Sequence, residues 1–564
     1  MLRCKNCGGN VVFNIERQDV ECVFCGSRFP VSDYDHDRGA GEQPKLDEVT
    51  GQPMNFDPQT GERLQPAGNA EDPEKSQYYE TVIHTCTQCG AQIITPDNAA
   101  VGFCSYCGTE AVLESRIARE RRPAWIIPFK KSKQDCRDIY MKAIGKEPYI
   151  PKEFKDPEFI DKFRGIYIPY WEYKVGFESE PTFKVTEVYS EGDYNIHNEY
   201  TVTPKLGVYE TEIPLDASSG FDDELAAAIA PFNRQKMVPF SPGYLAGLFA
   251  DTADVAPQVY EREVISKAQD SAIKSIEGQF KGTVHADITA DTDKRIPILG
   301  TKIQKLTSEL CPVWFLTWRK GQRLAYAVIN GETGKVFAEV PVDIGSFLLR
   351  SGLIAAVLFA ILTIGGTLIL PPTMVLIAAA TAFAAQLLYR AEIRALRDKE
   401  QKYNDLGALK DMPMEKIVKV QKIREKKRRG TKLGCVSIVA VIIAIMVAVT
   451  LFVDANAENK AMGGTFFIVL GGLLTWLSCL KPVLGVKEKS MLLGMTLPLA
   501  AEILAFVVCA AETVEDWKFY GAAIICLAAV MITALSMILR YNRLCTRGIP
   551  DFHDRKGGAR YEAG

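Results

Sequence analysis

Six long apolar runs near the carboxyl end constrain this chain more than any other feature. Each run approaches the roughly 20 residues that a helix needs to cross a bilayer core. A helix is required because lipid offers backbone amides no other partner. The sequence therefore predicts about six membrane-spanning helices within 344–540, although runs one and two could instead form a re-entrant hairpin. The runs are 352–370, 373–389, 433–453, 463–480, 491–511 and 520–539.

The charges of the connecting segments predict the orientation. Segment 390–432 carries fifteen Lys and Arg against seven Asp and Glu, and segment 481–490 is also basic. Segments 454–462 and 512–519 are acidic instead. Basic segments stay in the cytoplasm, and no apolar leader precedes Cys4. We therefore expect a multi-pass protein of the cell membrane with its N- and C-termini in the cytoplasm.

The basic segment 390–432 has a further reading of its own. Its parts 390–401 and 414–428 are predicted to be helical extensions of the flanking spans. The second part carries a cluster of Lys and Arg that suits contact with anionic lipid. The lipid bilayer is therefore the first expected partner.

Eight of the fifteen cysteines form four Cys-x2-Cys pairs, and glycine follows each pair. Such a turn directs two thiolates at one centre, and glycine permits the backbone to turn around the sulfurs. Two pairs at this spacing make a four-thiolate zinc site. The predicted ligands of two zinc ions are Cys4, Cys7, Cys22 and Cys25 in one ribbon, and Cys86, Cys89, Cys104 and Cys107 in the other.

Four thiolates leave no open position on the metal, so both zinc sites are predicted to be structural. Rubredoxin-like iron is the rival metal, while a cytoplasmic location disfavours disulfides. The second ribbon has no Lys or Arg between residues 81 and 114, which disfavours binding to nucleic acid. Contact with a cytoplasmic protein is therefore the expected role of the ribbons.

The chain divides by composition into six parts. Residues 32–80 contain twelve acidic and four basic residues with few aliphatic ones, so we expect a flexible linker that lets the first ribbon explore space. The predicted fold class is a multidomain protein with two small zinc ribbons, an α+β soluble domain and an all-α transmembrane bundle. The boundaries are 1–31 (ribbon 1), 32–80 (linker), 81–114 (ribbon 2), 124–343 (α+β domain), 344–540 (membrane region) and 541–564 (basic cytoplasmic tail).

Residues 125–341 mix strand and helix patterns. Aromatic and branched residues predict strands at 166–175, 182–189, 198–202 and 208–213, and a three-strand meander at 313–318, 323–329 and 335–340. Helical spacing predicts helices at 222–230 and 258–279. A proline, one residue and then a tryptophan occur at Pro169 and again at Pro312, which suggests an internal duplication.

Together with the cysteine pairs, several short motifs carry a resemblance to a family. They include Trp125-Ile-Ile-Pro-Phe129, Gly165-Ile-Tyr-Ile-Pro-Tyr-Trp171, Tyr244-Leu-Ala-Gly247 and Asn330-Gly-Glu-Thr-Gly-Lys335. Residues 1–345 resemble bacterial tandem zinc-ribbon membrane proteins of uncharacterised function. Such proteins often carry a label from the primosomal replication-restart helicase. The G-x-x-x-x-G-K-[ST] loop that binds ATP phosphates is missing from this sequence, which argues against that label.

We find no catalytic motif, so we expect no enzyme and no catalytic residue. Asp216-Ala-Ser-Ser219 could hold a nucleophilic serine but is better explained as a turn before a helix cap. The leading hypothesis is a non-enzymatic adaptor that recruits a cytoplasmic protein to the inner membrane face. One alternative is a transporter or channel that uses Glu502, a carboxyl inside the fifth run. The other is a nucleic-acid-binding protein.

Overall fold

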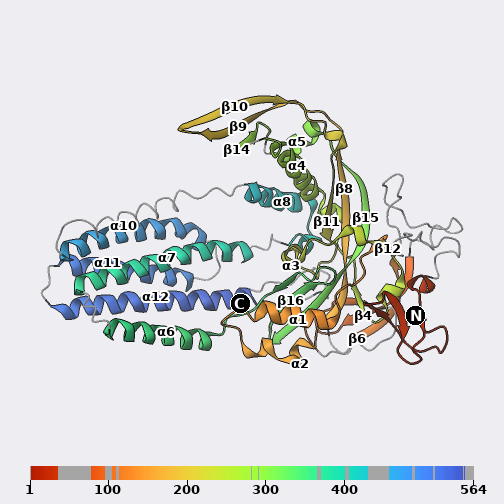
Figure 1. Cartoon of the computed structure of the whole chain (residues 1–564), viewed down its shortest axis with the longest axis horizontal. Coiled ribbons are helices and arrows are strands. Elements are labelled where there is room, and N and C mark those ends of the chain that lie inside the picture. Colours follow the sequence, from red (N-terminus) through yellow and green to blue (C-terminus); the bar gives the residue numbers. More distant parts are fainter. Residues whose placement is uncertain are drawn as a thin grey trace.

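A computed structural model describes residues 2–35, 78–95, 104–109, 113–280, 283–289, 291–364, 370–400, 405–429, 457–484, 490–511, 515–550 and 552. A sheet-rich body lies at one end of the long axis and a bundle of helices at the other (Figure 1). Two cysteine groups lie near the amino terminus, and four apolar helices occupy the carboxyl-terminal region. The predicted fold class is therefore confirmed.

Two long strands form the centre of the body. β8 (Arg164–Phe177) and β15 (Thr301–Lys320) pair antiparallel along most of their lengths. Both strands are rich in branched and aromatic residues, which suits a sheet with buried faces. The strands and the meander predicted from the sequence are all present. The neighbouring body strands are β7 (Trp125–Ile126), β11 (Glu210–Asp216), β12 (Val238–Pro239), β13 (Phe249–Asp251), β16 (Arg323–Asn330) and β17 (Val336–Ala338).

The pairing of β8 with β15 has the symmetry of a duplication. Ile168 lies opposite Cys311, and the Pro-x-Trp motifs run away from this pair in opposite directions. The short strand β13 pairs parallel with β8 at Tyr167, and β7 pairs parallel with β15 at the corresponding Leu310. β11 and β16 likewise occupy corresponding edges of the two long strands. The structure thus supports the suspected internal duplication.

The two motif tryptophans make matching hydrogen bonds. Trp171 Nε1 donates to the carbonyl of Val255 at 2.8 Å, and Trp314 Nε1 donates to the carbonyl of Lys131 at 2.8 Å. Each acceptor follows the short parallel strand at the same spacing. Because each short strand pairs with the long strand of the other half, the halves are interlocked and form one sheet.

Helices cover the body sheet. α1 (Lys133–Ile144) follows β7 and begins at a capping box between Ser132 and Asp135. α3 (Asp223–Ile229) begins at the side-chain cap Asp222, as the sequence predicts. α4 (Glu261–Glu277) follows β13 and confirms the second predicted helix. The two short helices are α2 (Pro157–Ile160) and α5 (Thr292–Leu299).

A separate three-stranded sheet forms an arm. It consists of β9 (Phe183–Glu191), β10 (Tyr194–Val202) and β14 (Thr283–Ala286), in the order β10-β9-β14. Figure 1 shows this arm leaving the top of the body and reaching along the direction in which the bundle lies.

Each cysteine group sits among its own short strands. The first has β1 (Val11–Asn14), β2 (Asp19–Cys22) and β3 (Arg28–Phe29) in a small sheet. The second has β4 (Tyr78–Cys86), β5 (Gln92–Thr95) and β6 (Leu113–Arg121). β5 pairs with β13, so these three strands belong to the main sheet of the body. The predicted domain boundaries stay predictions.

The first cysteine unit is docked on the body, which corrects the expectation that it explores space. The Phe13 N–H donates to the Ala246 carbonyl at 2.8 Å, and the Ser241 hydroxyl donates to the Val31 carbonyl at 3.1 Å. A Cβ at Gly247 would lie 2.9 Å from Val12 Cγ1, so this motif glycine permits the close approach. The composition of 32–80 carries no signal for this docking, and residues 36–77 of the predicted linker lie outside the described residues.

Four described helices are long and apolar enough to cross a membrane. They match the second, fourth, fifth and sixth predicted runs, while the third run lies at 433–453, outside the described residues. The first run falls mostly on α6 (Ile344–Ile364), whose apolar side chains are largely exposed. The number of crossings stays a prediction. The four helices lie within α7 (Pro371–Glu400), α10 (Ala457–Leu484), α11 (Ser490–Ala510) and α12 (Asp516–Leu544).

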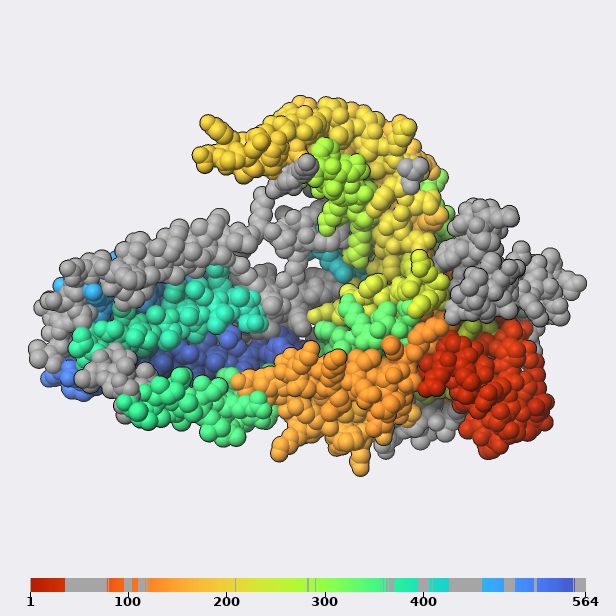
Figure 2. All heavy atoms as spheres, in the orientation of Figure 1, coloured from red at the N-terminus to blue at the C-terminus, as the bar shows by residue number. Residues whose placement is uncertain are grey.

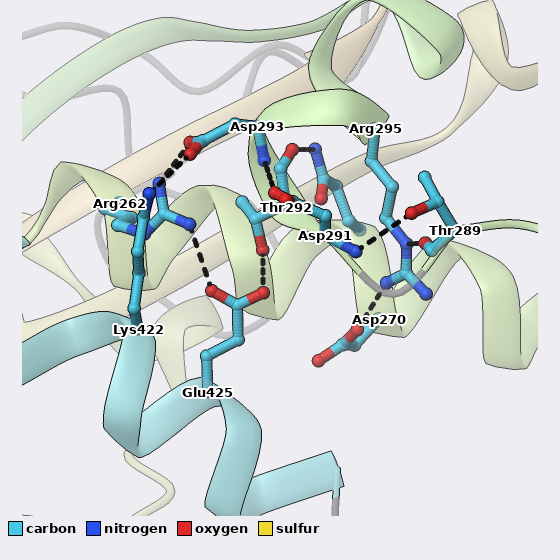
Figure 3. A network of polar contacts seen from close by, with 10 residues as sticks. Arg262, Asp270, Thr289, Asp291, Thr292, Asp293, Arg295, Lys422 and Glu425 are labelled. Atoms are coloured by element: carbon cyan, nitrogen blue, oxygen red, sulfur yellow. Dashed lines mark hydrogen bonds and ion pairs between the residues drawn. The ribbon is translucent and has the colours of Figure 1, made fainter. Parts of the chain in front are cut away.

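The described part of the basic segment includes α8 (Met414–Arg429), which packs on the body. Figure 3 shows its contacts: Arg262 of α4 binds Glu425 at 3.3 Å, and Lys422 binds Asp293 of α5 at 3.1 Å. The Thr292 hydroxyl also donates to Glu425. At least part of the positive charge predicted to meet lipid is therefore neutralised by carboxylates of the body.

The chain after α12 returns to the body. β18 (Arg547–Gly548) pairs with β16. Arg547 is 2 % exposed and binds Asp222 at 3.2 Å and Glu339 at 2.5 Å, with its guanidinium over the ring of Tyr326. Within the predicted basic tail, residues 541–544 thus still belong to α12, and residues 547–548 are part of the sheet.

We expect Arg547→Ala to destabilise the body by about 3–5 kcal/mol, because it leaves two buried carboxylates without their cation. Urea unfolding of the detergent-purified chain, followed by tryptophan fluorescence, measures the change. Lys320→Ala removes the same charge from a side chain that is 70 % exposed, and it should change stability little. Equal effects of the two substitutions would contradict the buried role of Arg547.

Candidate metal centres

The structure brings the eight predicted cysteines together in two groups of four. In the first group, the Cys4 and Cys25 sulfurs lie 3.6 Å apart and the Cys7 and Cys22 sulfurs 3.5 Å apart. In the second group, the corresponding separations are 3.7 Å for both pairs, Cys86 with Cys107 and Cys89 with Cys104. Within each group all four sulfurs lie within 4.8 Å of one another.

The backbone around each pair explains this convergence. The N–H of the glycine after each pair donates to the carbonyl of the first cysteine, as Gly8 does to Cys4 at 2.9 Å and Gly90 to Cys86 at 2.7 Å. All four glycines have positive φ, between 66° and 74°. Residues other than glycine rarely adopt this backbone conformation. The Cys-x2-Cys-Gly spacing therefore builds the same turn four times.

The sulfur geometry fits a tetrahedral metal. With metal–sulfur bonds of about 2.3 Å, the sulfurs of a tetrahedral site lie about 3.8 Å apart. The observed separations are close to that value, so both groups could bind a zinc ion. Four thiolates complete the coordination, which leaves no position for a substrate or water.

The second group is held inside the body. All four of its cysteines are 0 % exposed. In the turn of its last two cysteines, the Tyr106 carbonyl accepts from Tyr326 of β16 at 2.7 Å, and the carbonyl of Cys107 itself accepts from Arg319 of β15 at 3.2 Å. The main sheet of the body therefore holds this turn by direct hydrogen bonds.

The first group lies at the surface instead. Its Cys7 and Cys25 are exposed, whereas Cys4 and Cys22 are buried. Val23 and Phe24, the two residues between Cys22 and Cys25, are 63 % and 76 % exposed. We call these two residues the apolar knuckle.

A polar cluster that sequence reasoning missed lies beside the second group. Tyr106 donates its hydroxyl to Asp251 at 2.5 Å, and Ser218 donates to the same carboxylate. Burial raises the pKa of Asp251 to about 7, while these two hydrogen bonds act to lower it. No spacing in the sequence links these residues, since three separate segments supply them.

The Asp216–Ser219 segment joins this cluster. Ser219 donates its hydroxyl to Asp254 at 2.6 Å, and Lys410 binds both Asp254 and the Ser219 oxygen. A cavity of ≈ 420 Å³ adjoins these residues. The segment precedes the cap Asp222, as the sequence predicts.

The chain is similar in sequence to a known bacterial protein. The chain is 29% identical over 242 residues to the uncharacterized protein YdjG of Bacillus subtilis (strain 168), covering 42% of this chain and 68% of that protein. No family model matches the chain. No solved structure matches it either. The resemblance to uncharacterised zinc-ribbon membrane proteins thus has support, while the primosomal label has none.

We expect the detergent-purified chain to contain two zinc ions, measured by inductively coupled plasma mass spectrometry. A chelating dye should remove them in two phases, because the first group is exposed and the second is buried. Cys25→Ser should abolish the fast phase and spare the slow one. Cys136→Ser, a change at a buried cysteine outside both groups, should keep both ions. Release in one phase from the unmodified chain would contradict the assignment.

Proposed function

We propose that this protein is a membrane-anchored, non-enzymatic adaptor whose cysteine groups hold two structural zinc ions and which recruits a cytoplasmic protein. The exposed apolar knuckle carries the proposal. Other apolar residues of the first unit, such as Val11 and Val20, are buried, at 1 % and 0 % exposure. Val23 and Phe24 are therefore apolar residues that do not contribute to the core of the first unit.

The place of the first unit suits recruitment. Figure 2 shows this unit, in red, at the end of the molecule opposite the helical bundle. With the bundle in a membrane, that end points away from lipid. Large aromatic and aliphatic side chains exposed on a rigid turn are typical anchors of protein interfaces. The metal-shaped turn supplies the rigidity.

The proposed orientation combines contact and charge. The body touches α8, so the body lies on the same side of the membrane as segment 390–432. That segment is the most basic connection of the membrane region, and basic connections stay in the cytoplasm. Both observations support the proposal that the body lies at the inner face of the cell membrane.

Nucleic acid suits the first unit less well. Lys5 pairs with Asp33 at 3.2 Å, and Arg17 pairs with Asp19 at 3.4 Å and also with Glu21. These cations already have carboxylate partners, whereas phosphate binding needs cations free to replace counterions. This pairing supports a protein partner.

We expect the double variant Val23→Ser with Phe24→Ser to lose a partner that co-purifies with the unmodified chain, because the apolar anchors are gone. Affinity capture of the full chain from detergent-solubilised membranes and cytosol, read by quantitative mass spectrometry, makes the comparison. Ile117→Ser, at an apolar side chain that is 73 % exposed on β6, is the matched control. If no captured protein depends on the knuckle, the adaptor proposal fails.

A second candidate function, a transporter or channel, rests on Glu502 in α11. Its side chain is 0 % exposed, and both carboxyl oxygens lack a hydrogen-bond partner among the described residues. A Cβ at Gly472 of α10 would overlap Oε2, so the glycine makes room for this carboxyl. A carboxyl inside a membrane bundle is costly unless it holds a proton or a cation.

For this candidate we expect dicyclohexylcarbodiimide to label Glu502, because the reagent partitions into lipid and reacts with protonated carboxyls. Peptide mass spectrometry locates the adduct, and Glu515, which is 57 % exposed, should stay unlabelled. Glu502→Gln should also abolish proton or sodium flux into liposomes. An unlabelled Glu502 together with unchanged flux would remove the second candidate.

A further inference from the structure

A cavity of ≈ 560 Å³ lies between the body sheet and α3, away from both cysteine groups. β8 and β11 supply one side, α3 and the turn after it supply another, and Leu406 and Arg424 of the described segment 405–429 close a third. The volume is in the range of small-ligand sites in proteins. Neither the proposed adaptor role nor the zinc sites use this cavity.

Several residues that line this cavity have a buried polar atom with no hydrogen-bond partner among the described residues. Asp216 is 2 % exposed, and its Oδ2 has no hydrogen-bond partner among the described residues. Tyr170 lies opposite Asp216 in the sheet and is 5 % exposed. Its hydroxyl also has no hydrogen-bond partner among the described residues. Asp223 uses Oδ2 to bind Arg424 at 3.0 Å, while its Oδ1 stays unpaired. A buried carboxylate oxygen without a partner carries a desolvation cost that a ligand can remove.

The charge around the cavity points to a cation. Burial raises the pKa of Asp216, and the nearby Asp223 carboxylate raises it further. A bound cation would lower that pKa again, because a positive charge beside a carboxylate favours its charged form. Arg234 is already shared by Glu172, Glu212 and Glu309. The wall has more carboxylates than cations: Glu212, Asp216, Asp223, Glu263 and Glu309 against Arg234, Lys267 and Arg424.

The remaining wall points to an organic cation. Pro231 and Phe232 line the cavity together with alanines of α3, and the Phe232 ring packs edge-on against Tyr170 at 5.8 Å. These carboxylates do not form a metal cluster, since only the two cysteine groups bring three or more ligand atoms together among the described residues. A hard metal ion needs several oxygens converging on one point, whereas an ammonium group needs two or three acceptors.

We propose that this cavity binds a small organic amine, with its ammonium group on Asp216 and Asp223 and its apolar part against Pro231 and Phe232. The position of Arg424, which lines one side of the cavity, does not depend on a bound ligand. Arg262 with Glu425 and Lys422 with Asp293 hold α8 on the body independently (Figure 3). The site is therefore formed before the ligand arrives.

Benzylamine is a suitable probe because it joins a primary ammonium to one ring. We expect saturable binding to the full-length protein in detergent, with a Kd in the millimolar range, measured by isothermal titration calorimetry. Benzyl alcohol has the same shape without the charge and should bind at least tenfold more weakly. Asp216→Asn keeps the shape of the side chain and should also weaken benzylamine binding at least tenfold.

Two further variants keep the test decisive. Ala227→Phe fills the cavity from an exposed position of α3 and should abolish binding while Asp216 is kept. Asp411→Asn removes the same charge from an exposed carboxylate outside this cavity and should leave binding unchanged. Absence of saturable benzylamine binding overturns the proposal. Equal binding of benzylamine by the unmodified chain and by Asp216→Asn also overturns the proposal. The Asp216 carboxylate would then not bind the ammonium group, and water would be its partner instead.

Discussion

The antiparallel pairing of β8 with β15 is the interaction on which the rest of the body depends. On one side, β8 carries β13, which joins the strands around the second cysteine group. On the other, β15 pairs with β16, which also pairs with β18, the short strand that follows α12. Because the two halves exchange their short strands, loss of the β8–β15 pairing would separate the strands around the second cysteine group from β16 and β18.

This pairing also gives the two similar cysteine groups different surroundings. The second group is enclosed because side chains of β15 and β16 donate hydrogen bonds to the backbone carbonyls of Tyr106 and Cys107. The first group is held to the body by β1 and by residues 31–35 after its small sheet, and it leaves Val23 and Phe24 exposed. The same Cys-x2-Cys-Gly turn is therefore enclosed within the body in one group and forms part of the surface in the other.

Much of the fold could be read from local patterns. The cysteine turns needed only the Cys-x2-Cys-Gly spacing, and the helix after Asp222 needed only its cap and its acidic first turn. The docking of the first unit could not be read in this way. It depends on Gly247 and the Ala246 carbonyl, more than two hundred residues away, and no periodicity connects them to Phe13. Arg547 is likewise one of several cations in the predicted basic tail, and nothing near it in the sequence indicates that it pairs with Asp222 and Glu339.

The sequence by itself determined the thiolate turns, the apolar helices and the main strands, because each depends on residues that are neighbours along the chain. Only the tertiary structure decided which cysteine group is buried, that α8 lies on the body, and that Asp216, Tyr170 and Asp223 share one cavity. Those outcomes depend on which distant surfaces meet. Burial and charge pairing across such contacts are properties of the assembled sheet, and no single stretch of sequence contains them.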